Sequence, residues 1–288
     1  MTDFPLFSIL IANYNNGRFL QDAINSVLAQ TYPNWEIVLV DDASTDDSAE
    51  IYERLKDNSR IRIYHNAENK GCGYTKRRCV ELAHGKVCGF LDPDDALVND
   101  AIEIMIKEHI DFADASMVYS RYYYSDIDLS ILGISKHQCE LPAESSFLQY
   151  GNGAISQFTS FKKELYDKTP GINECYKRSV DHALYFLLEE VGKIRFIDKP
   201  LYYYRFNTGN NISTNSNADI AFLWDLIVMA DACKRRGIDI EKTIYDKFVQ
   251  HVDKKELDAY LRGEDHVRMT KTYKIGRIVL MPLRWLKK

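Results

Sequence analysis

The sequence predicts an α/β protein with a mostly parallel sheet flanked by helices, followed by a C-terminal helical extension. Strand patterns and helix patterns alternate through the first third of the chain, as expected of parallel strands joined by helical crossovers. The strand patterns are continuous apolar runs, which is typical of strands that helices cover on both faces. From Ala218 onward the pattern is helical to the end.

Apolar runs rich in β-branched residues predict the strands of this first third, at Phe7–Asn13, Glu36–Val40, Ile61–His65 and Val87–Leu91. Helical spacing of apolar residues predicts helices in the segments between them, at Phe19–Gln30, Asp46–Lys56 and Thr75–Ala83. Ligands of such sheets bind at the carboxyl ends of the strands, so we expect a site there.

The second part of the chain is less regular. Met117–Tyr124 and Phe158–Lys162 predict strands, and Val180–Val191 predicts a helix. Arg195–Tyr204 predicts a pair of strands that is interrupted at Lys199-Pro200, because proline has no N–H to donate to a sheet.

The chain length bounds the domain organisation. A chain of 288 residues suits one large domain or two small ones. The polar segment Asn207–Asn217 predicts a loop and therefore a boundary. We divide the chain into an α/β half at 1–105, a second half of the same domain at 106–217, and a helical extension at 218–288.

Composition argues against several classes of protein. The formal net charge is −5, so we expect no nucleic-acid partner. The six cysteines are scattered without a C-x-x-C pair, so we expect neither a disulfide framework nor a zinc site. The N-terminus lacks the positive charge of a signal peptide, and no apolar run approaches the ~20 residues of a membrane span. These features predict a cytoplasmic protein.

The end of the chain forms a basic tail. After Asp265 there is no acidic residue, and residues 268–288 mix lysine and arginine with apolar residues that include Trp285. Such an amphipathic segment can lie on an anionic membrane surface, or it can pack on the body of the protein with its charges in solvent. Both alternatives stay open, and the first would place the protein at the inner face of the cell membrane.

An acidic segment follows the last strand of the first third. Asp92, Asp94 and Asp95 repel one another, and a divalent cation such as Mg²⁺ or Mn²⁺ would neutralise them. The alternative is a surface turn, since Asp and Pro are common turn formers. Because Asp41, Asp42 and Tyr14 also follow buried strands, we favour a site over a turn.

Glycine-rich phosphate loops are missing from the chain. No G-x-G-x-x-G follows a strand, and no Walker-type loop ends in Lys-Ser or Lys-Thr. The phosphates of a bound nucleotide would therefore need another source of positive charge. A metal held by carboxylates would supply it, and would suit a reaction whose leaving group is a diphosphate.

The segments FSILIANYNNGRFLQDAINSVLAQTYPNWEIVLVDDASTDDS and ENKGCGYTKRRCVELAHGKVCGFLDPDD resemble the opening of family-2 glycosyltransferases, which are inverting enzymes with the GT-A fold. The resemblance is dense over about the first hundred residues, where several motifs recur in order. Further on it thins to patches such as RSVDHALYF and YYYRFNTGNNIS. It implies that residues 1–105 bind a nucleotide-sugar and that residues 106–217 bind the acceptor.

The resemblance implies roles for the residues around the nucleotide. Ala12 and Tyr14 would lie against the base, Tyr14 by stacking. Asp42 would accept a hydrogen bond from N3–H of uracil, which favours a UDP-sugar donor. Lys76 stands where arginine is usual, and would be the cation near the base or diphosphate. A lysine gives a point charge in place of the planar fork of arginine.

The resemblance also implies a metal site and a base. Asp95 would be the principal ligand of Mn²⁺ or Mg²⁺, with Asp94 beside it facing the ribose and Asp92 in support. Asp181 matches the general base that takes the proton of the acceptor hydroxyl. From the residues alone, a helix-capping role for Asp181 is the preferred interpretation. Asn207 stands where histidine is usual, and its role stays open.

These features together predict a metal-dependent inverting glycosyltransferase. It would move a sugar from a UDP-sugar to a hydroxyl of a glycan or lipid-linked saccharide, in the synthesis of a surface polysaccharide. One rival is a sugar-phosphate nucleotidyltransferase, which should show a glycine-rich loop where this chain has only Gly17. Another rival is a non-catalytic homologue that binds nucleotide-sugars, which the departures at Lys76 and Asn207 keep open.

Overall fold

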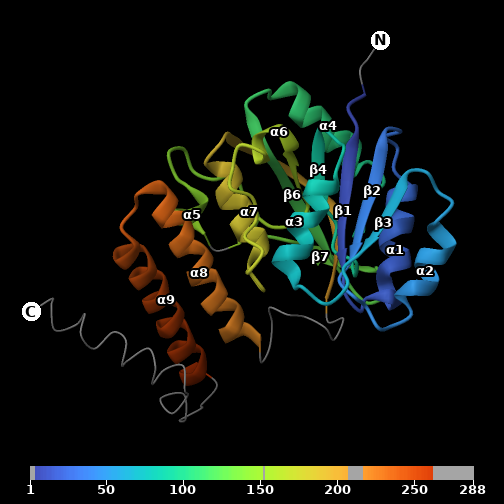
Figure 1. Ribbon diagram of the computed structural model, residues 1–288. Helices are drawn as coiled ribbons and strands as arrows, with labels where there is room; N and C mark the ends of the chain where they lie inside the picture. The colour runs from blue at the N-terminus through green and yellow to red at the C-terminus, as the bar shows by residue number, and fades with distance from the viewer. Residues whose placement is uncertain (1–3, 152, 207–216, 262–288) are drawn as a thin grey trace, which may run out of the picture.

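The computed structural model describes residues 4–151, 153–206 and 217–261 (Figure 1). Its first third alternates strands and helices as predicted. The strands are β1 (Phe7–Asn13), β2 (Trp35–Asp41), β3 (Ile61–His65) and β4 (Val87–Phe90). The helices between them are α1 (Gly17–Leu28), α2 (Ser48–Leu55) and α3 (Cys72–Leu82). The strand predictions for Phe7–Asn13 and Ile61–His65 are confirmed to the residue, and the other boundaries agree to within three residues.

The next part of the chain adds short elements and two long strands. The strands are β5 (Ala96–Leu97), β6 (Ala115–Ser125), β7 (Ile131–Ile134), β8 (Thr159–Lys162) and β9 (Lys193–Arg205). The helices are α4 (Ala101–Asp111), α5 (Phe147–Tyr150), α6 (Lys163–Tyr166) and α7 (Val180–Glu189). Helix α4 has no counterpart among the predicted elements.

The predicted break at Lys199-Pro200 is wrong. One strand, β9, runs through both residues and pairs with β6 in parallel. Its register against β6 shifts on either side of Arg121, whose partner is Pro200. The irregular register accommodates a residue that cannot donate a ladder hydrogen bond, so the strand continues past the proline.

All these strands form one mixed sheet in the order β3-β2-β1-β4-β8-β6-β9-β5, with β7 paired to β6. The four strands of the first third are parallel, whereas β8 runs antiparallel to both β4 and β6. Helices cover both faces (Figure 1). One core lies between the sheet and α1, α2 and α4, and the other between the sheet and α3, α5, α7 and α8. The predicted fold class is confirmed, with the parallel strands confined mainly to the first half.

The C-terminal extension begins with α8 (Ala218–Arg236) and α9 (Ile240–Leu261). Helix α8 packs beside α7, and α9 lies along the outer side of α8 (Figure 1). Among the helices that the structure describes, none is long and apolar enough to cross a membrane. The predicted loop at Asn207–Asn217, except for its last residue, and the basic tail at 268–288 lie outside the described residues.

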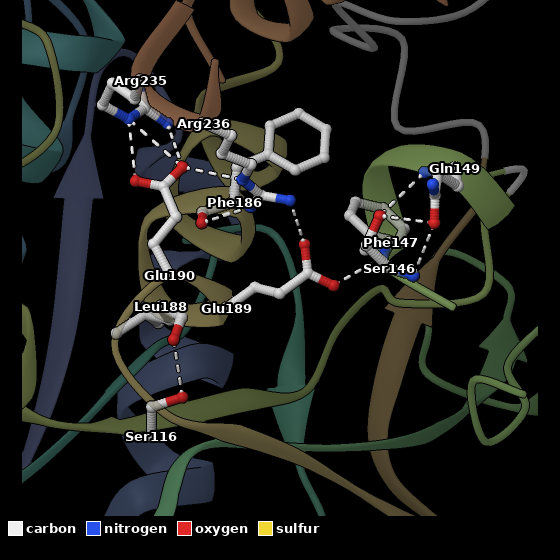
Figure 2. A network of polar contacts seen from close by, with 10 residues as sticks. All are labelled: Ser116, Ser146, Phe147, Gln149, Phe186, Leu188, Glu189, Glu190, Arg235 and Arg236. Atoms are coloured by element: carbon white, nitrogen blue, oxygen red, sulfur yellow. Dashed lines mark hydrogen bonds and ion pairs between the residues drawn. The ribbon is translucent and has the colours of Figure 1, made fainter. Parts of the chain in front are cut away.

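A polar network fastens α8 to α7 and α5 (Figure 2). Arg236 donates to the Glu189 carboxylate at 2.6 Å and to the carbonyl oxygen of Phe186 at 2.7 Å. Glu189 also accepts the backbone N–H of Phe147 at the start of α5. Arg235 pairs with Glu190 at 2.9 Å. The arginines of α8 therefore supply positive charge to the C-terminal end of α7, where the helix dipole favours cations.

Candidate active site

A cleft of about 910 Å³ opens at the carboxyl ends of β1, β2 and β4. Side chains from both halves of the chain and from α8 line it. All the predicted site residues are among them: Ala12, Tyr14, Asp42, Lys76, Asp92, Asp94, Asp95 and Asp181. The structure thus brings these residues into one cavity, and their individual roles stay predictions. Asn207 lies outside the described residues.

Three non-glycine residues at this cleft or beside it have left-handed backbone conformations. Asn15 follows β1 with φ 54°, Ala43 follows β2 with φ 61°, and Ser179 precedes α7 with φ 54°. Such a conformation costs a non-glycine residue of order 1–3 kcal/mol and persists where the surroundings enforce it. The chain turns sharply at these points, which places the neighbouring Tyr14, Asp42 and Asp181 at the cavity.

Asp42 organises the segment that leads into α3. Its carboxylate accepts the backbone N–H groups of Lys70 and Gly71, both at 2.8 Å, and the side-chain amide of Asn66 at 2.6 Å. Three donors fix the orientation of this buried side chain. Tyr14, in contrast, is 46% exposed and free to cover a planar ligand ring.

Lys76 on α3 connects two parts of the cleft. Its ammonium nitrogen lies 2.6 Å from the Asp181 carboxylate and 3.3 Å from that of Asp92. Burial disfavours its charge, but the Asp181 and Asp92 carboxylates outweigh that cost and hold the pKa of Lys76 well above its usual value. Lys76 is therefore a cation held between two anions, an arrangement that no local sequence pattern reveals.

Asp181 lies in the first turn of α7. The capping alternative is wrong, because the N-cap is Ser179 and the Asp181 carboxylate bonds to Lys76. Burial acts to raise the pKa of Asp181, but the charge and hydrogen bond of Lys76 hold it below the ordinary value. Asp181 is thus a carboxylate at neutral pH, as a proton acceptor must be.

His182, the next residue, contacts Asp225 on α8 through Nδ1 at 2.5 Å. Burial acts to lower the pKa of His182, but Asp225 and then Asp181 raise it above the ordinary value. This pair ties the turn that carries Asp181 to the C-terminal extension.

Asp95 is the most enclosed acid of the acidic segment, at 2% exposure, which argues against a simple surface turn. Its two oxygens accept the Tyr202 hydroxyl and the Arg205 backbone N–H, each at 2.7 Å. Burial and the charges of Asp94 and Asp92 raise the pKa of Asp95 well above its ordinary value. Ionisation of Asp95 without a cation nearby therefore costs free energy.

Arg205 at the end of β9 supports the acidic segment and was not predicted to do so. Its guanidinium donates to the Asp94 carbonyl oxygen at 2.7 Å and to the Asp22 carboxylate at 2.8 Å, and lies over the Phe19 ring. The only sequence signal was its place at the end of a tyrosine run, YYYR. This buried arginine fixes the backbone that presents Asp94 and Asp95.

The donor set suits a hard divalent cation that is shared with a substrate. Within the described residues, no group of three or more His, Cys, Asp or Glu side chains is placed to hold a metal ion. Mg²⁺ commonly takes one or two carboxylates, with phosphate oxygens and waters completing its octahedron. Asp94 and Asp95 can supply those carboxylates, and a cation there would offset the repulsion that raises the pKa of Asp95.

A mixed α/β sheet with a carboxylate-lined cleft at the carboxyl ends of its parallel strands is the arrangement in which α/β proteins bind their ligands. The family model described as Glycosyl transferase family 2 matches residues 8–174. The chain therefore belongs to glycosyl transferase family 2.

Relatives and solved structures agree with this membership. The chain is 29% identical to a hyaluronan synthase of Pasteurella multocida over 245 residues, which cover 85% of this chain and 24% of that protein. It is 28% identical to the glycosyltransferase GlyG of Streptococcus pneumoniae, covering 82% of this chain and 83% of that one. A crystal structure of S. aureus TarS in complex with UDP superposes with a TM-score of 0.62 at 18% identity, over 82% of this chain and 68% of that one. The chain spans about a quarter of the length of the synthases it matches.

Proposed function

We propose that this protein is an inverting glycosyltransferase that moves a sugar from a UDP-sugar to a saccharide hydroxyl. The observation that carries the proposal is the meeting of Asp42, Asp95 and Asp181 in one cleft, although they come from distant parts of the chain. Crystal structures of TarS with UDP and with UDP-GlcNAc support the choice of donor. The hyaluronan and chondroitin synthases among the relatives support polysaccharide synthesis.

The nucleotide would bind at the ends of β1 and β2. Tyr14 covers one face of the uracil ring, and Ala12 lies against the ring. Asp42 accepts N3–H of uracil. Its carboxylate is held in a fixed orientation by three other donors before the nucleotide binds. This preorganisation lowers the entropy lost on binding.

The diphosphate would lie along the acidic segment. Asp94 and Asp95 are the residues that would hold Mg²⁺ or Mn²⁺ there, and such an ion would supply positive charge for the diphosphate. Arg205 holds the backbone of this segment in place through the Asp94 carbonyl oxygen.

Asp181 would act as the general base. It accepts the proton of the acceptor hydroxyl while the hydroxyl oxygen attacks the anomeric carbon from the face opposite UDP. The new glycosidic bond forms as the bond to the diphosphate oxygen breaks, and UDP takes that electron pair. Lys76 keeps Asp181 ionised beforehand and orients its carboxylate.

The acceptor class and cellular place follow as further parts of the proposal. A glycan or lipid-linked saccharide enters from the side of α7 and α8, where Asp181 and Asp225 line the cleft. We place the reaction at the cytoplasmic face of the membrane, with residues 268–288 as the membrane contact.

Hydrolysis of a panel of UDP-sugars in the presence of Mn²⁺ tests the proposal without an acceptor. The measured quantity is the rate of UDP release. Asp181→Asn should lower the rate about 10²–10⁴-fold and leave UDP binding intact, because only the proton acceptor changes. Asp57→Asn, in the exposed turn after α2, is the matched control and should keep full activity.

Two results would contradict the proposal. UDP binding without hydrolysis of any UDP-sugar, and without transfer, would indicate a non-catalytic binding protein. Formation of a UDP-sugar from UTP and a sugar phosphate, with release of pyrophosphate, would indicate a nucleotidyltransferase.

A further inference from the structure

A second cavity of about 280 Å³ lies between α5, α7, α8 and α9. His182, Phe222 and Asp225 line both this cavity and the large cleft. The two cavities therefore adjoin at these three residues, and His182 directly follows Asp181 in α7. A ligand that filled the small cavity could extend a neighbouring group toward the Asp181 carboxylate.

Helix α9 presents a row of basic side chains to this cavity. Lys247, His251 and Lys254 line it at intervals of four and three residues, so they share one face of the helix. Among the side chains that the structure describes, no carboxylate pairs with Lys247 or Lys254. We call the cavity lined by these three residues the basic pocket.

The acids around the basic pocket are already engaged. Asp225 pairs with His182 at 2.5 Å, and Asp219 pairs with Lys255, which follows Lys254 in α9. Burial and the charge of Lys255 lower the pKa of His251 below its ordinary value, so at neutral pH the two lysines carry the charge. The basic pocket therefore holds positive charge without a matching carboxylate among the described residues, and it is suited to an anion.

Aromatic walls accompany this charge. The Phe222 ring stacks on the His251 imidazole, with centroids 3.7 Å apart and planes 7° apart. Phe147 and Phe186 also line the cavity, and their ring centroids lie 5.4 Å apart. Flat apolar surfaces beside cations suit a sugar ring that carries an acidic group.

The polar network of Figure 2 holds together α5, α7 and α8, the helices that carry Phe147, Phe186 and Phe222. Arg236 joins α8 to α7 through Glu189, and Glu189 accepts the backbone N–H of Phe147. The three helices under the pocket are thus fixed to one another before a ligand arrives, which lowers the entropic cost of binding.

We propose that the basic pocket binds the anionic group, a carboxylate or a phosphate, of a saccharide acceptor. Lys247 and Lys254 receive this group, and a hydroxyl of the same acceptor reaches Asp181. The inference rests on the proposed glycosyltransferase function and assigns its acceptor to the acidic saccharides.

Calorimetric titration of the full chain with UDP present tests this inference. The probes are a tetrasaccharide that ends in glucuronic acid, its carboxyl-reduced neutral form, and a phosphate-bearing tetrasaccharide of the same length. The acidic probes should bind about tenfold tighter than the neutral one, as two partly exposed charge contacts allow. Comparison of the two acidic probes distinguishes a carboxylate from a phosphate ligand.

The double variant Lys247→Gln/Lys254→Gln should reduce the affinity for the acidic probes to that for the neutral one. Lys234→Gln/Lys242→Gln removes the same charge from exposed positions outside the pocket and should bind like the wild type. Equal affinity for acidic and neutral probes, or no binding of the acidic probes, overturns the inference. Absence of UDP-sugar hydrolysis by the wild-type protein would instead overturn the proposed function.

Discussion

At the scale of single residues, Lys76 favours the ionised form of the Asp181 carboxyl group in the cleft. It bonds to Asp181 at 2.6 Å and approaches Asp92 at 3.3 Å, so one ammonium serves two carboxylates. An arginine at this position would offer a fork to both anions, whereas lysine offers a single point charge. The stronger contact goes to Asp181, and the pKa of that carboxyl falls as a result.

Substitution of Lys76 by methionine should therefore make Asp181 harder to ionise. Without the charge of Lys76 the folded-state pKa of Asp181 rises, and the acidic limb of log kcat/KM for UDP-sugar turnover should move to higher pH. The pH–rate profiles of both proteins test this shift. Asp92→Asn is the matched control, because it removes a carboxylate and keeps the cation, so its acidic limb should not move to higher pH. An unmoved limb in Lys76→Met would show that Asp181 is not the base.

At the scale of elements, the position of Lys76 depends on how closely α3 approaches the segment before α7. Gly73 donates its backbone N–H to the Tyr176 carbonyl oxygen at 2.8 Å. A Cβ at position 73 would lie 2.5 Å from that oxygen and 2.6 Å from the Asn173 oxygen. Glycine is thus needed here for close approach, in spite of its weak helix propensity.

Gly73→Ala should separate the two elements. The gain in helix propensity of roughly 1 kcal/mol is smaller than the strain of overpacking against backbone, so we expect a net loss of about 1–2 kcal/mol in the free energy of unfolding. Urea unfolding measures this loss, and kcat should fall because Lys76 moves away from Asp181. Gly133→Ala in β7 adds the same methyl with nothing within 4 Å and should change stability by less than about 0.5 kcal/mol. Equal stability of both variants would refute the close-approach argument.

The elements also show how far the sequence predicts the structure. Strands β1, β2 and β4 were predictable because each is a local apolar run buried on both faces, whereas β3 is only partly buried and was predicted from its two isoleucines. The continuity of β9 through Pro200 was not, because it depends on pairing with β6 some 80 residues earlier. In the site, Asp42 and Asp95 were found from their places after strands. The Lys76–Asp181 contact and the support from Arg205 join residues more than 100 positions apart, and no local pattern encodes them.

At the scale of the whole molecule, the mixed sheet joins the two halves into one body. Strand β8 lies between β4 of the first half and β6 of the second, and hydrogen-bonds to both. The cleft is lined by side chains from both halves and from α8, so the binding free energy of a ligand that filled it would stabilise the entire fold.

Thermal unfolding with UDP and Mn²⁺ should reveal this linkage. At one hundred times Kd, the ligand adds about 2.7 kcal/mol, which corresponds to a rise in Tm of about 4–5 °C for a chain of this size. UDP without metal should give a smaller rise, and Asp95→Asn should abolish the difference between the two conditions. An equal rise with and without Mn²⁺ in the wild type would contradict a metal role for Asp95.

The distance in sequence between Lys76 and Asp181 also orders events during synthesis. The ribosome releases the strand ends that would hold the nucleotide before the helix that carries the carboxylate partner. The two residues are 105 positions apart, so at ordinary elongation rates roughly 5–20 s separate their emergence. During that interval Asp92 is the carboxylate left to Lys76 in this pair of contacts, and the cleft residues of the first half emerge before Asp181.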